Sequence, residues 1–315
     1  MNSLIEKGSV NEIPGYNCKT ANGERLNVVN PPFGIFMLIV GIVMQIIYPI
    51  YYYVIYSKGD LQYSSYKQCS LLFNSIATGI FLIFGIEFCD DNTLIYVFGC
   101  LITGIWVAFT TSSVILLFNR IVEIYSRTHM NTLFGGVRPF IWCAISFSIG
   151  VLAFFFCRPV IFNAAVIWRL VIVQALSWIW DPQIPNGGFD YLHYSAPLIN
   201  INNIATCSIF VFLYLLLSIG AIKNRDKLVP MQIEVLKQSS LIGLFSLATS
   251  SLYILMQFVA VPAFIITLSF LFYVGSSVIP GLVFVLFNFS VREAVIRVFT
   301  CSYRVTNNHP HITIP

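Results

Sequence analysis

The stretch TLIYVFGCLITGIWVAFTTSSVILLFN, from Thr93 to Asn119, holds no charged residue and decides the class of the protein. A helix needs about 20 mainly apolar residues to cross the hydrocarbon core of a bilayer, and this stretch exceeds that length. Its apolar residues surround the whole helix and do not alternate with polar ones, which excludes the strands of a membrane barrel. The sequence therefore predicts a membrane-spanning helix here.

Six more stretches of this kind follow or precede it. They are Pro32–Tyr56, Lys67–Ile86, Phe140–Cys157, Ile201–Ile222, Ser239–Phe258 and Phe264–Phe287. Of the 315 residues, 57% are hydrophobic and only 10% are charged, whereas soluble domains carry about 25% charged residues. We therefore predict an all-α membrane protein with a seven-helix transmembrane bundle over residues 32–288, in contact with the lipid bilayer. This composition excludes a soluble enzyme, a disordered chain and a disulfide-rich secreted module.

A further apolar stretch, Pro159–Trp180, raises the alternative of eight spans. It contains Arg169, and an arginine at the centre of a span costs about 2.5–3.5 kcal/mol. With seven spans and the N-terminus outside, twelve Lys and Arg residues lie in inner segments and five in outer ones, of seventeen in all. Eight spans would reverse this bias, against the positive-inside rule. We therefore predict an extracellular segment 1–31, a long second extracellular loop 158–200 at the mouth of the bundle, and a cytoplasmic tail 289–315.

The predicted spans are almost free of ionisable residues. Glu87 lies at an outer end and Arg120 at an inner end, whereas ion-coupled transporters and pumps carry charged groups within the membrane. The sequence also has no nucleotide, hydrolase or zinc-site motif, so we predict no enzymatic activity, no cofactor and no metal site. The Lys and Arg residues form no basic stripe, which argues against binding to nucleic acid.

One face of the third predicted span joins its two ends. Counting back in sevens from Arg120 gives Ser113, Trp106 and Gly99, which lie on the same side of a helix. This face connects a charged residue at the inner mouth to the outermost of these positions, 21 residues and about 31 Å away at 1.5 Å per residue. Two interpretations of Arg120 remain open at this point, an anchor at the membrane surface and a switch that gates an inner cavity.

An ordered set of short motifs extends from about residue 15 to residue 300. It includes Gly15-Tyr16-Asn17-Cys18, Tyr48-Pro49, Tyr66-Lys67, Gly99…Trp106…Asn119-Arg120, Leu133-Phe134-Gly135-Gly136-Val137-Arg138 and Trp180-Asp181-Pro182. In order and spacing this set resembles the nematode serpentine receptor class T (Srt) family of G-protein-coupled receptors. The resemblance implies a chemosensory receptor in the plasma membrane, including that of sensory-neuron cilia. Such a receptor binds a small extracellular molecule and signals through a heterotrimeric G protein.

The resemblance also implies a G-protein coupling switch formed by Asn119, Arg120 and Pro280. Receptors of this kind usually carry an acidic residue before the arginine, and Asn119 stands there in this sequence. An ion pair within that motif is therefore impossible. Glu123 lies three residues after Arg120 on the same helical face and is the alternative local partner. Asn74 occupies a position in the second span where aspartate is common, which argues against a bound sodium ion.

Helix spacing and depth nominate a ligand pocket in the outer half of the bundle. Its predicted residues are Thr103, Trp106, Tyr253, Gln257 and Tyr273. We predict that the second extracellular loop covers this pocket and that an uncharged pocket takes a small neutral or weakly polar ligand. Ordinary packing is the alternative role for each aromatic residue. The alternative function is a ligand-gated ion channel or membrane transporter, and a receptor-channel of the insect type would place the N-terminus inside.

Three cysteines, Cys18, Cys89 and Cys157, lie at or near the oxidising outer side in this topology. A Cys18–Cys89 disulfide is the preferred prediction, with Cys89–Cys157 or no bond as alternatives. After the last span, residues 291–299 place apolar residues opposite charged ones, which predicts a short amphipathic helix at the membrane surface. Cys301 just beyond it is either palmitoylated or an ordinary reduced cysteine.

Overall fold

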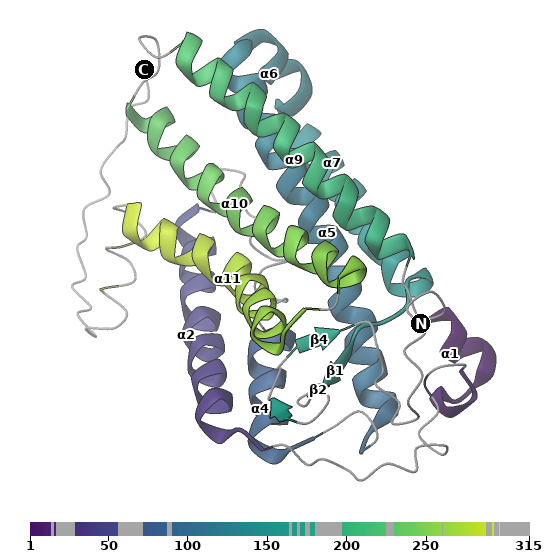
Figure 1. The fold of residues 1–315 in the computed structure, drawn as a ribbon. Coiled ribbons are helices and arrows are strands. Elements are labelled where there is room, and N and C mark those ends of the chain that lie inside the picture. Colours follow the sequence, from purple (N-terminus) through teal and green to yellow (C-terminus); the bar gives the residue numbers. More distant parts are fainter. Residues whose placement is uncertain are drawn as a thin grey trace.

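The structure is a computed structural model, and Figure 1 shows a bundle of long helices with short strands towards one end. The residues that it describes are 1–13, 16, 29–55, 72–86, 90–163, 166–168, 171–173, 177–179, 197–224, 230–259, 261–287, 292 and 296. Among these residues, six helices are long and apolar enough to cross a membrane. Their order along the chain follows the order of the predicted spans.

The long helices cover six of the seven predicted spans. They are α2 (Pro31–Ile55), α5 (Asn92–Tyr125), α7 (Arg138–Phe156), α9 (Pro197–Lys223), α10 (Pro230–Phe258) and α11 (Ala263–Phe287). The described part of the remaining span starts as a π-helical segment, η4 (Leu72–Ala77), and continues as α4 (Thr78–Phe84). The short helix α6 (Arg127–Phe134) joins α5 to α7.

The longest helix, α5, extends past the predicted span at its C-terminal end. It begins where the side chain of Asp91 accepts a hydrogen bond from the Leu94 amide at 3.0 Å, an ordinary N-terminal cap. Its 34 residues give a length of about 51 Å at 1.5 Å per residue, whereas the hydrocarbon core is about 30 Å thick. The helix therefore extends beyond the predicted end of the membrane span at Asn119. The helix continues through the polar residues after Asn119 because these can leave the hydrocarbon without ending the helix.

Two pairs of neighbouring helices pack through glycine. A Cβ atom on Gly34 of α2 would lie 2.8 Å from the carbonyl oxygen of Gly79 in α4, and the reverse distance would be 2.7 Å. Gly104 of α5 and Gly150 of α7 face each other in the same way, at 2.9 Å in both directions. Lipid tails are as apolar as leucine, so membrane helices associate through close packing, which small residues permit. These glycines bring the backbones of each pair into contact.

The proline inside α11, Pro280, is covered by α2. A proline removes one N–H group and disturbs the hydrogen bonds of the preceding turn. The hydroxyl of Tyr48 in α2 donates a hydrogen bond to the backbone carbonyl of Ser277, three residues before Pro280. A side chain on the next residue, Gly281, would overlap Met44 of α2. A tyrosine from another helix thus satisfies the backbone near this proline, as membrane proteins require.

The segment between α7 and α9 forms short strands and contains no described helix. β1 (Ile161–Asn163) pairs antiparallel with β4 (Ser177–Ile179), and β2 (Val166–Trp168) pairs antiparallel with β3 (Val171–Val173). The first pair contacts α5 and α11, so it lies across the end of the bundle. This excludes the alternative of an eighth span. The structure also adds four strands to the predicted all-helical architecture. The strands pair backbone N–H and C=O groups that would otherwise lack hydrogen-bond partners.

Part of the N-terminal segment, predicted as an extracellular tail, packs against the bundle. It forms α1 (Asn2–Lys7) and the 3-10 turn η1 (Val10–Glu12). The ring of Tyr16 meets Tyr96 of α5 edge to face at 5.1 Å, and its hydroxyl donates to the carbonyl of Pro159 at 3.4 Å. Burial raises the pKa of Tyr16, which keeps the phenol protonated and able to donate. Asn92 at the start of α5 donates to Asn11 at 2.9 Å.

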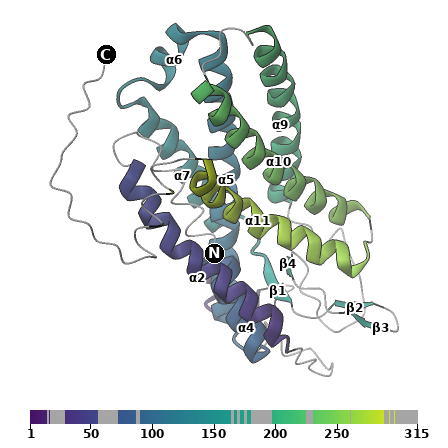
Figure 2. The same cartoon turned by 90° about the vertical axis from the view of Figure 1, so that its left-hand side faces the viewer.

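The two ends of the bundle are therefore different, and the two views in Figures 1 and 2 place α6 and the strands far apart. We call the end with β1–β4 and the N-terminal segment the strand end, and the opposite end the α6 end. Between them, large apolar side chains face outward on several helices. Examples are Phe140, Phe147, Phe156, Phe212 and Leu215. Such surfaces fit contact with lipid tails.

Candidate functional site

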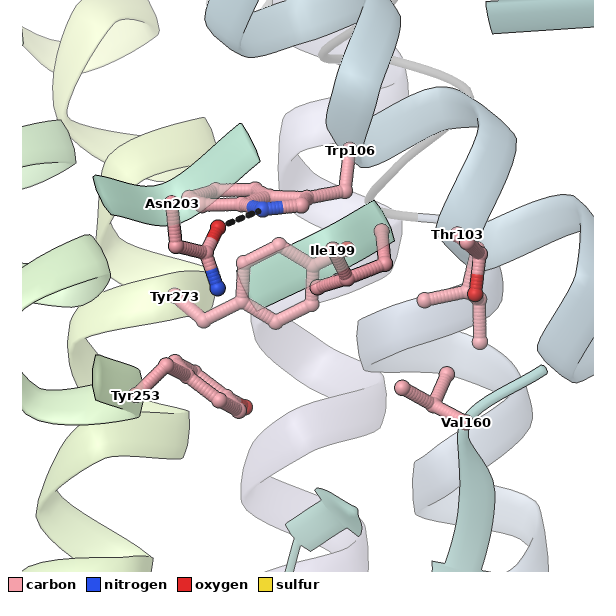
Figure 3. Close-up of a pocket in the computed structure, with 8 residues that line it drawn as sticks. Thr103, Trp106, Val160, Ile199, Asn203, Tyr253 and Tyr273 are labelled. Atoms are coloured by element: carbon pink, nitrogen blue, oxygen red, sulfur yellow. Dashed lines mark hydrogen bonds between the residues drawn. The ribbon is translucent and has the colours of Figure 1, made fainter. Parts of the chain in front are cut away.

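A cavity lies between four helices near the strand end, where β1 approaches the bundle. It is lined by Ile102, Thr103, Trp106, Val160, Ile199, Asn203, Tyr253 and Tyr273. These residues come from α5, α9, α10 and α11 and from the residue just before β1. Figure 3 shows the aromatic rings on one side and Thr103 and Val160 on the other. The cavity measures about 30 Å³, room for one or two water molecules.

Four of the five residues predicted for the ligand pocket line this cavity. They are Thr103, Trp106, Tyr253 and Tyr273. The fifth, Gln257, lies on α10 one turn after Tyr253, but its side chain is outside the described part of the structure. Helix spacing and depth were thus enough to bring residues from three different spans to one place. Their role in ligand binding remains a prediction.

Four lining residues were missed from the sequence, namely Ile102, Val160, Ile199 and Asn203. Asn203 is the informative one because it is the polar partner of Trp106. The sequence around it, Asn200 to Asn203, places three asparagines at the start of an apolar span, and that clustering was a usable signal. Val160 carried no such signal, since only the path of the loop brings it to the cavity.

The side chains of the cavity wall are connected to one another. The indole Nε1 of Trp106 donates to Oδ1 of Asn203 at 3.0 Å, and its ring meets Tyr273 edge to face at 5.0 Å. Tyr253 and Tyr273 are also edge to face, at 6.3 Å. On the far side, the amide nitrogen of Asn74 donates to the hydroxyl of Tyr273 at 2.9 Å. This chain of contacts joins the described part of the second span to α5, α9, α10 and α11.

The electrostatics of the cavity are simple. No Asp, Glu, Lys, Arg or His is among its lining residues. Across the described parts of the chain, no group of three or more His, Cys, Asp or Glu side chains is arranged to hold a metal ion. The cavity can therefore offer hydrogen bonds, aromatic faces and apolar surface to a molecule that enters it.

The predicted face of α5 is buried along its length. A side chain at Gly99 would overlap the carbonyl oxygen of Val160, so glycine is needed for the loop to approach. Trp106 reaches the cavity, and Ser113 is 3% exposed with its hydroxyl donating to the Phe109 carbonyl at 2.9 Å. Arg120 ends the series at the α6 end. One face of α5 thus carries the glycine that contacts the loop, the tryptophan that lines the cavity and the arginine at the α6 end.

At the α6 end, Arg120 pairs with Glu123. Its Nη1 lies 3.0 Å from Oε2 of Glu123, and the two side chains are 17% and 32% exposed. Glu123, the alternative local partner predicted from the sequence, is thus the residue that pairs with Arg120. A pair at this spacing on a partly exposed helix surface contributes about 0.5 kcal/mol or less. The Nε atom of Arg120 is buried without a hydrogen-bond partner in the described part of the structure.

Several predicted site residues cannot be placed. Cys18, Cys89 and Cys301 lie outside the described residues, as does most of the predicted amphipathic helix at 291–299. Cys157 is a buried free thiol, so the alternative Cys89–Cys157 bond is not formed. Pro280 lies inside α11, as the sequence predicts for a proline within the last span.

Comparisons with known proteins fit this arrangement. The model of a family described as "Serpentine type 7TM GPCR chemoreceptor Srt" matches residues 3–308. Among solved structures, the crystal structure of squid rhodopsin is similar, with a TM-score of 0.60 and 14% sequence identity over 90% of this chain and 92% of that chain. A search of curated proteins gave no match. At such low identity the rhodopsin similarity shows the fold, and it confirms the predicted seven-helix bundle.

Proposed function

Because the chain belongs to the Srt family of serpentine seven-transmembrane chemoreceptors coupled to G proteins, we propose that it binds a small extracellular molecule in the cavity near its strand end. The protein is a multi-pass membrane receptor and not an enzyme. In this proposal the α6 end faces the cytoplasm and binds a heterotrimeric G protein. The strand end then faces the outside of the cell, at the plasma membrane or on sensory cilia.

The observation that carries the proposal is the connected set of contacts around Trp106. Its indole bonds Asn203 of α9 and its ring touches Tyr273 of α11. A molecule that enters the cavity must displace at least one of these side chains, because the free volume of about 30 Å³ is below the roughly 150 Å³ of a cavity that binds benzene. Displacement would change how three helices pack on one another.

The route to the cytoplasmic end is α5 itself. Trp106 and Arg120 lie 14 residues apart on one face, which is about 21 Å along the helix. Among the described residues, the partner that restrains Arg120 is Glu123, in a weak local pair. A small rotation or shift of α5 after ligand binding therefore suffices to free the guanidinium for a partner. In this proposal Asn119, Arg120 and Pro280 form the coupling switch.

The channel or transporter alternative receives no support from the charges of the described helices. Ionisable residues on the long helices, such as Arg120, Arg138 and Lys223, lie near helix ends. A conduction or coupled-transport path usually has such groups within the membrane. A tag placed at residue 2 gives a direct test of topology. Accessibility on intact cells fits the receptor, and accessibility only after permeabilisation contradicts it.

The proposal is tested with cells that express the chain and report calcium or cAMP. A panel of odorants and metabolites identifies an agonist, after which Trp106→Leu is compared with wild type at matched surface expression. We expect Trp106→Leu to abolish the response or raise the half-maximal concentration at least tenfold. The matched control is Phe147→Leu, since Phe147 is 59% exposed on α7 and faces away from the cavity. Equal responses of Trp106→Leu and wild type would exclude this cavity as the ligand site.

A further inference from the structure

Three of the serine and threonine hydroxyls on α5 bond to backbone carbonyls of the same helix. Thr110 and Thr111 both donate to the carbonyl of Val107, at 3.1 and 2.9 Å, and Ser113 donates to the carbonyl of Phe109 at 2.9 Å. This is the usual behaviour of serine and threonine inside a helix. It satisfies the hydroxyl where no water is available.

Thr103 is the exception on the same helix. Its side chain is 2% exposed and lines the cavity, and its hydroxyl has no hydrogen-bond partner in the described part of the structure. Figure 3 shows the hydroxyl on the wall opposite Asn203. Burying an unsatisfied hydroxyl destabilises a protein, because the group loses its bonds to water and gains nothing in return. This hydroxyl is therefore available to a molecule that enters the cavity.

Asn203 supplies a second polar group. An indole N–H can only donate, so the atom that Trp106 contacts at 3.0 Å must be the side-chain oxygen of Asn203. That bond fixes the orientation of the amide. Its nitrogen then points away from Trp106, on the side of Tyr253 (Figure 3). The opposite wall of the cavity thus presents an N–H donor in a defined direction.

The rest of the wall is apolar or aromatic and carries no charge. Ile102, Val160 and Ile199 provide aliphatic surface, and Trp106 and Tyr273 provide aromatic surface. Of the eight lining residues, Tyr253 alone is more than slightly exposed, so it is the side chain with most freedom to move. An ion entering such a site would lose its hydration without a compensating partner. A hydrocarbon would leave the hydroxyl of Thr103 without a partner.

We propose that the ligand is a small uncharged organic molecule with a carbonyl or hydroxyl oxygen, and that Thr103 and Asn203 select it by hydrogen bonds to that oxygen. This inference rests on the proposed function and specifies the chemistry of its ligand. Among the described residues the hydroxyl of Thr103 has no hydrogen-bond partner, and the ligand supplies one. The aliphatic and aromatic walls hold the hydrocarbon part.

A first experiment needs no ligand. The melting temperatures of purified wild-type receptor, Thr103→Val and Thr110→Val are compared in lipid nanodiscs. Valine has nearly the shape of threonine without the hydroxyl. We expect Thr103→Val to melt at the same temperature as wild type or about 2 °C higher, because it removes an unsatisfied group. Thr110→Val should melt lower, because its hydroxyl is bonded. If the melting temperature of Thr103→Val falls as far as that of Thr110→Val, the inference is overturned.

A second experiment measures selectivity with three matched compounds, heptane, 2-heptanol and 2-heptanone. We expect the two oxygen-bearing compounds to raise the melting temperature of wild type and heptane to have little effect. Thr103→Val should bind the oxygen-bearing compounds about three- to tenfold more weakly, the loss of one hydrogen bond. Thr103→Ser, which keeps the hydroxyl, should restore binding.

The possible failures are distinguishable. Equal effects of heptane and 2-heptanone, or identical binding by wild type and Thr103→Val, overturn the selection by Thr103 and leave the cavity as a ligand site. A charged agonist whose response is lost in Trp106→Leu overturns the uncharged class and again leaves the proposed function intact. If none of the three compounds shifts the melting temperature, the inference is contradicted as well. The cavity is excluded as the ligand site only if the Trp106→Leu variant responds to an agonist as wild type does.

Discussion

The strand end and the α6 end of the bundle are built from equally apolar helices but are packed very differently. Among the described residues, one large buried cluster towards the strand end combines the N-terminal segment, β1 and six of the helices, namely α2, α4, α5, α7, α9 and α11. At the α6 end a separate cluster has only five buried members, all from α5 and α9. They are Leu117, Ile121, Phe210, Leu213 and Leu217.

The difference arises from the segments that cover each end. At the strand end Val10, Ile13 and Tyr16 are 1–6% exposed, although they belong to a polar segment with little helix. At the α6 end the covering element is α6, which accepts an exposed hydrogen bond from Arg138 to the Asn131 carbonyl at 2.9 Å and a half-buried one from Trp142 to the Leu133 carbonyl at 3.1 Å. Apolar composition alone therefore does not determine packing. In the proposed function, a closely packed strand end that binds the ligand and a less tightly packed α6 end favour movement at the α6 end.

The largest effect should come from a side chain at Gly99, because it disrupts the packing of the strand end. Gly99→Leu places its Cβ atom on the carbonyl oxygen of Val160, and this oxygen belongs to the backbone, which cannot move aside as a flexible side chain can. We expect the free energy of unfolding to fall by about 3 kcal/mol or more. Little receptor should then reach the cell surface. The control is Gly275→Ala, whose new atom would lie 3.2 Å from the ring of Phe245. Normal surface expression of Gly99→Leu would contradict the described contact.

Next in size is Arg120→Ala, which tests the α6 end alone. We expect surface expression near wild type, since only a weak surface pair with Glu123 is lost, and no G-protein activation by agonist. The measurement is agonist-stimulated nucleotide exchange at matched expression. Arg138→Ala is the control, because Arg138 is another basic residue at this end whose bond is to a backbone carbonyl within the same region. A normal agonist response from Arg120→Ala would leave Arg120 as a membrane anchor.

Removal of Tyr16 should loosen the strand end without abolishing folding. Tyr16→Ala loses the ring contact with Tyr96 and the bond to Pro159, so we expect about 3 kcal/mol of destabilisation. Tyr16→Phe loses only the hydroxyl and should cost about 0.5–1 kcal/mol. The local readout is the rate at which a maleimide labels Cys100, which is 1% exposed. An unchanged labelling rate in Tyr16→Ala would show that this segment does not close the bundle.

The smallest effect concerns the restraint on Arg120. Glu123→Gln removes a pair of about 0.5 kcal/mol, which changes an equilibrium about twofold, so basal signalling should rise by about that factor. Adding Asn119→Asp to this variant supplies a new carboxylate beside Arg120 and should lower basal signalling again. Basal nucleotide exchange at matched expression measures both. If neither change has an effect, local acids do not restrain Arg120 in the resting state.

The sequence was sufficient for the bundle and for half of the residues that line the cavity. Uncharged runs of about 20 residues fix the spans, because lipid leaves the backbone few alternatives. Helix spacing and depth then group Thr103, Trp106, Tyr253 and Tyr273 in the outer half of the bundle. The partner of Arg120 also followed from helix geometry, since residues three apart are neighbours on a helix surface.

What the sequence did not reveal depends on contacts between distant segments. The bond from Trp106 to Asn203 joins residues 97 positions apart, and no local pattern specifies it. The packing of Tyr16 was hidden in the same way, because a polar segment gives no sign that a few of its residues are buried. The strands between α7 and α9 were missed because that region is mainly apolar, with Arg169 inside it, and shows no strand-like alternation.

The contact between Gly99 and Val160 has a consequence for the evolution of such receptors. It involves a backbone carbonyl on one side and a residue without a side chain on the other. The position of the segment that leads into β1 therefore does not depend on the identity of residue 160, whose side chain lines the cavity. Relatives that keep the glycine can exchange the residue at this position and diversify what they detect, while the chain around the cavity follows the same path.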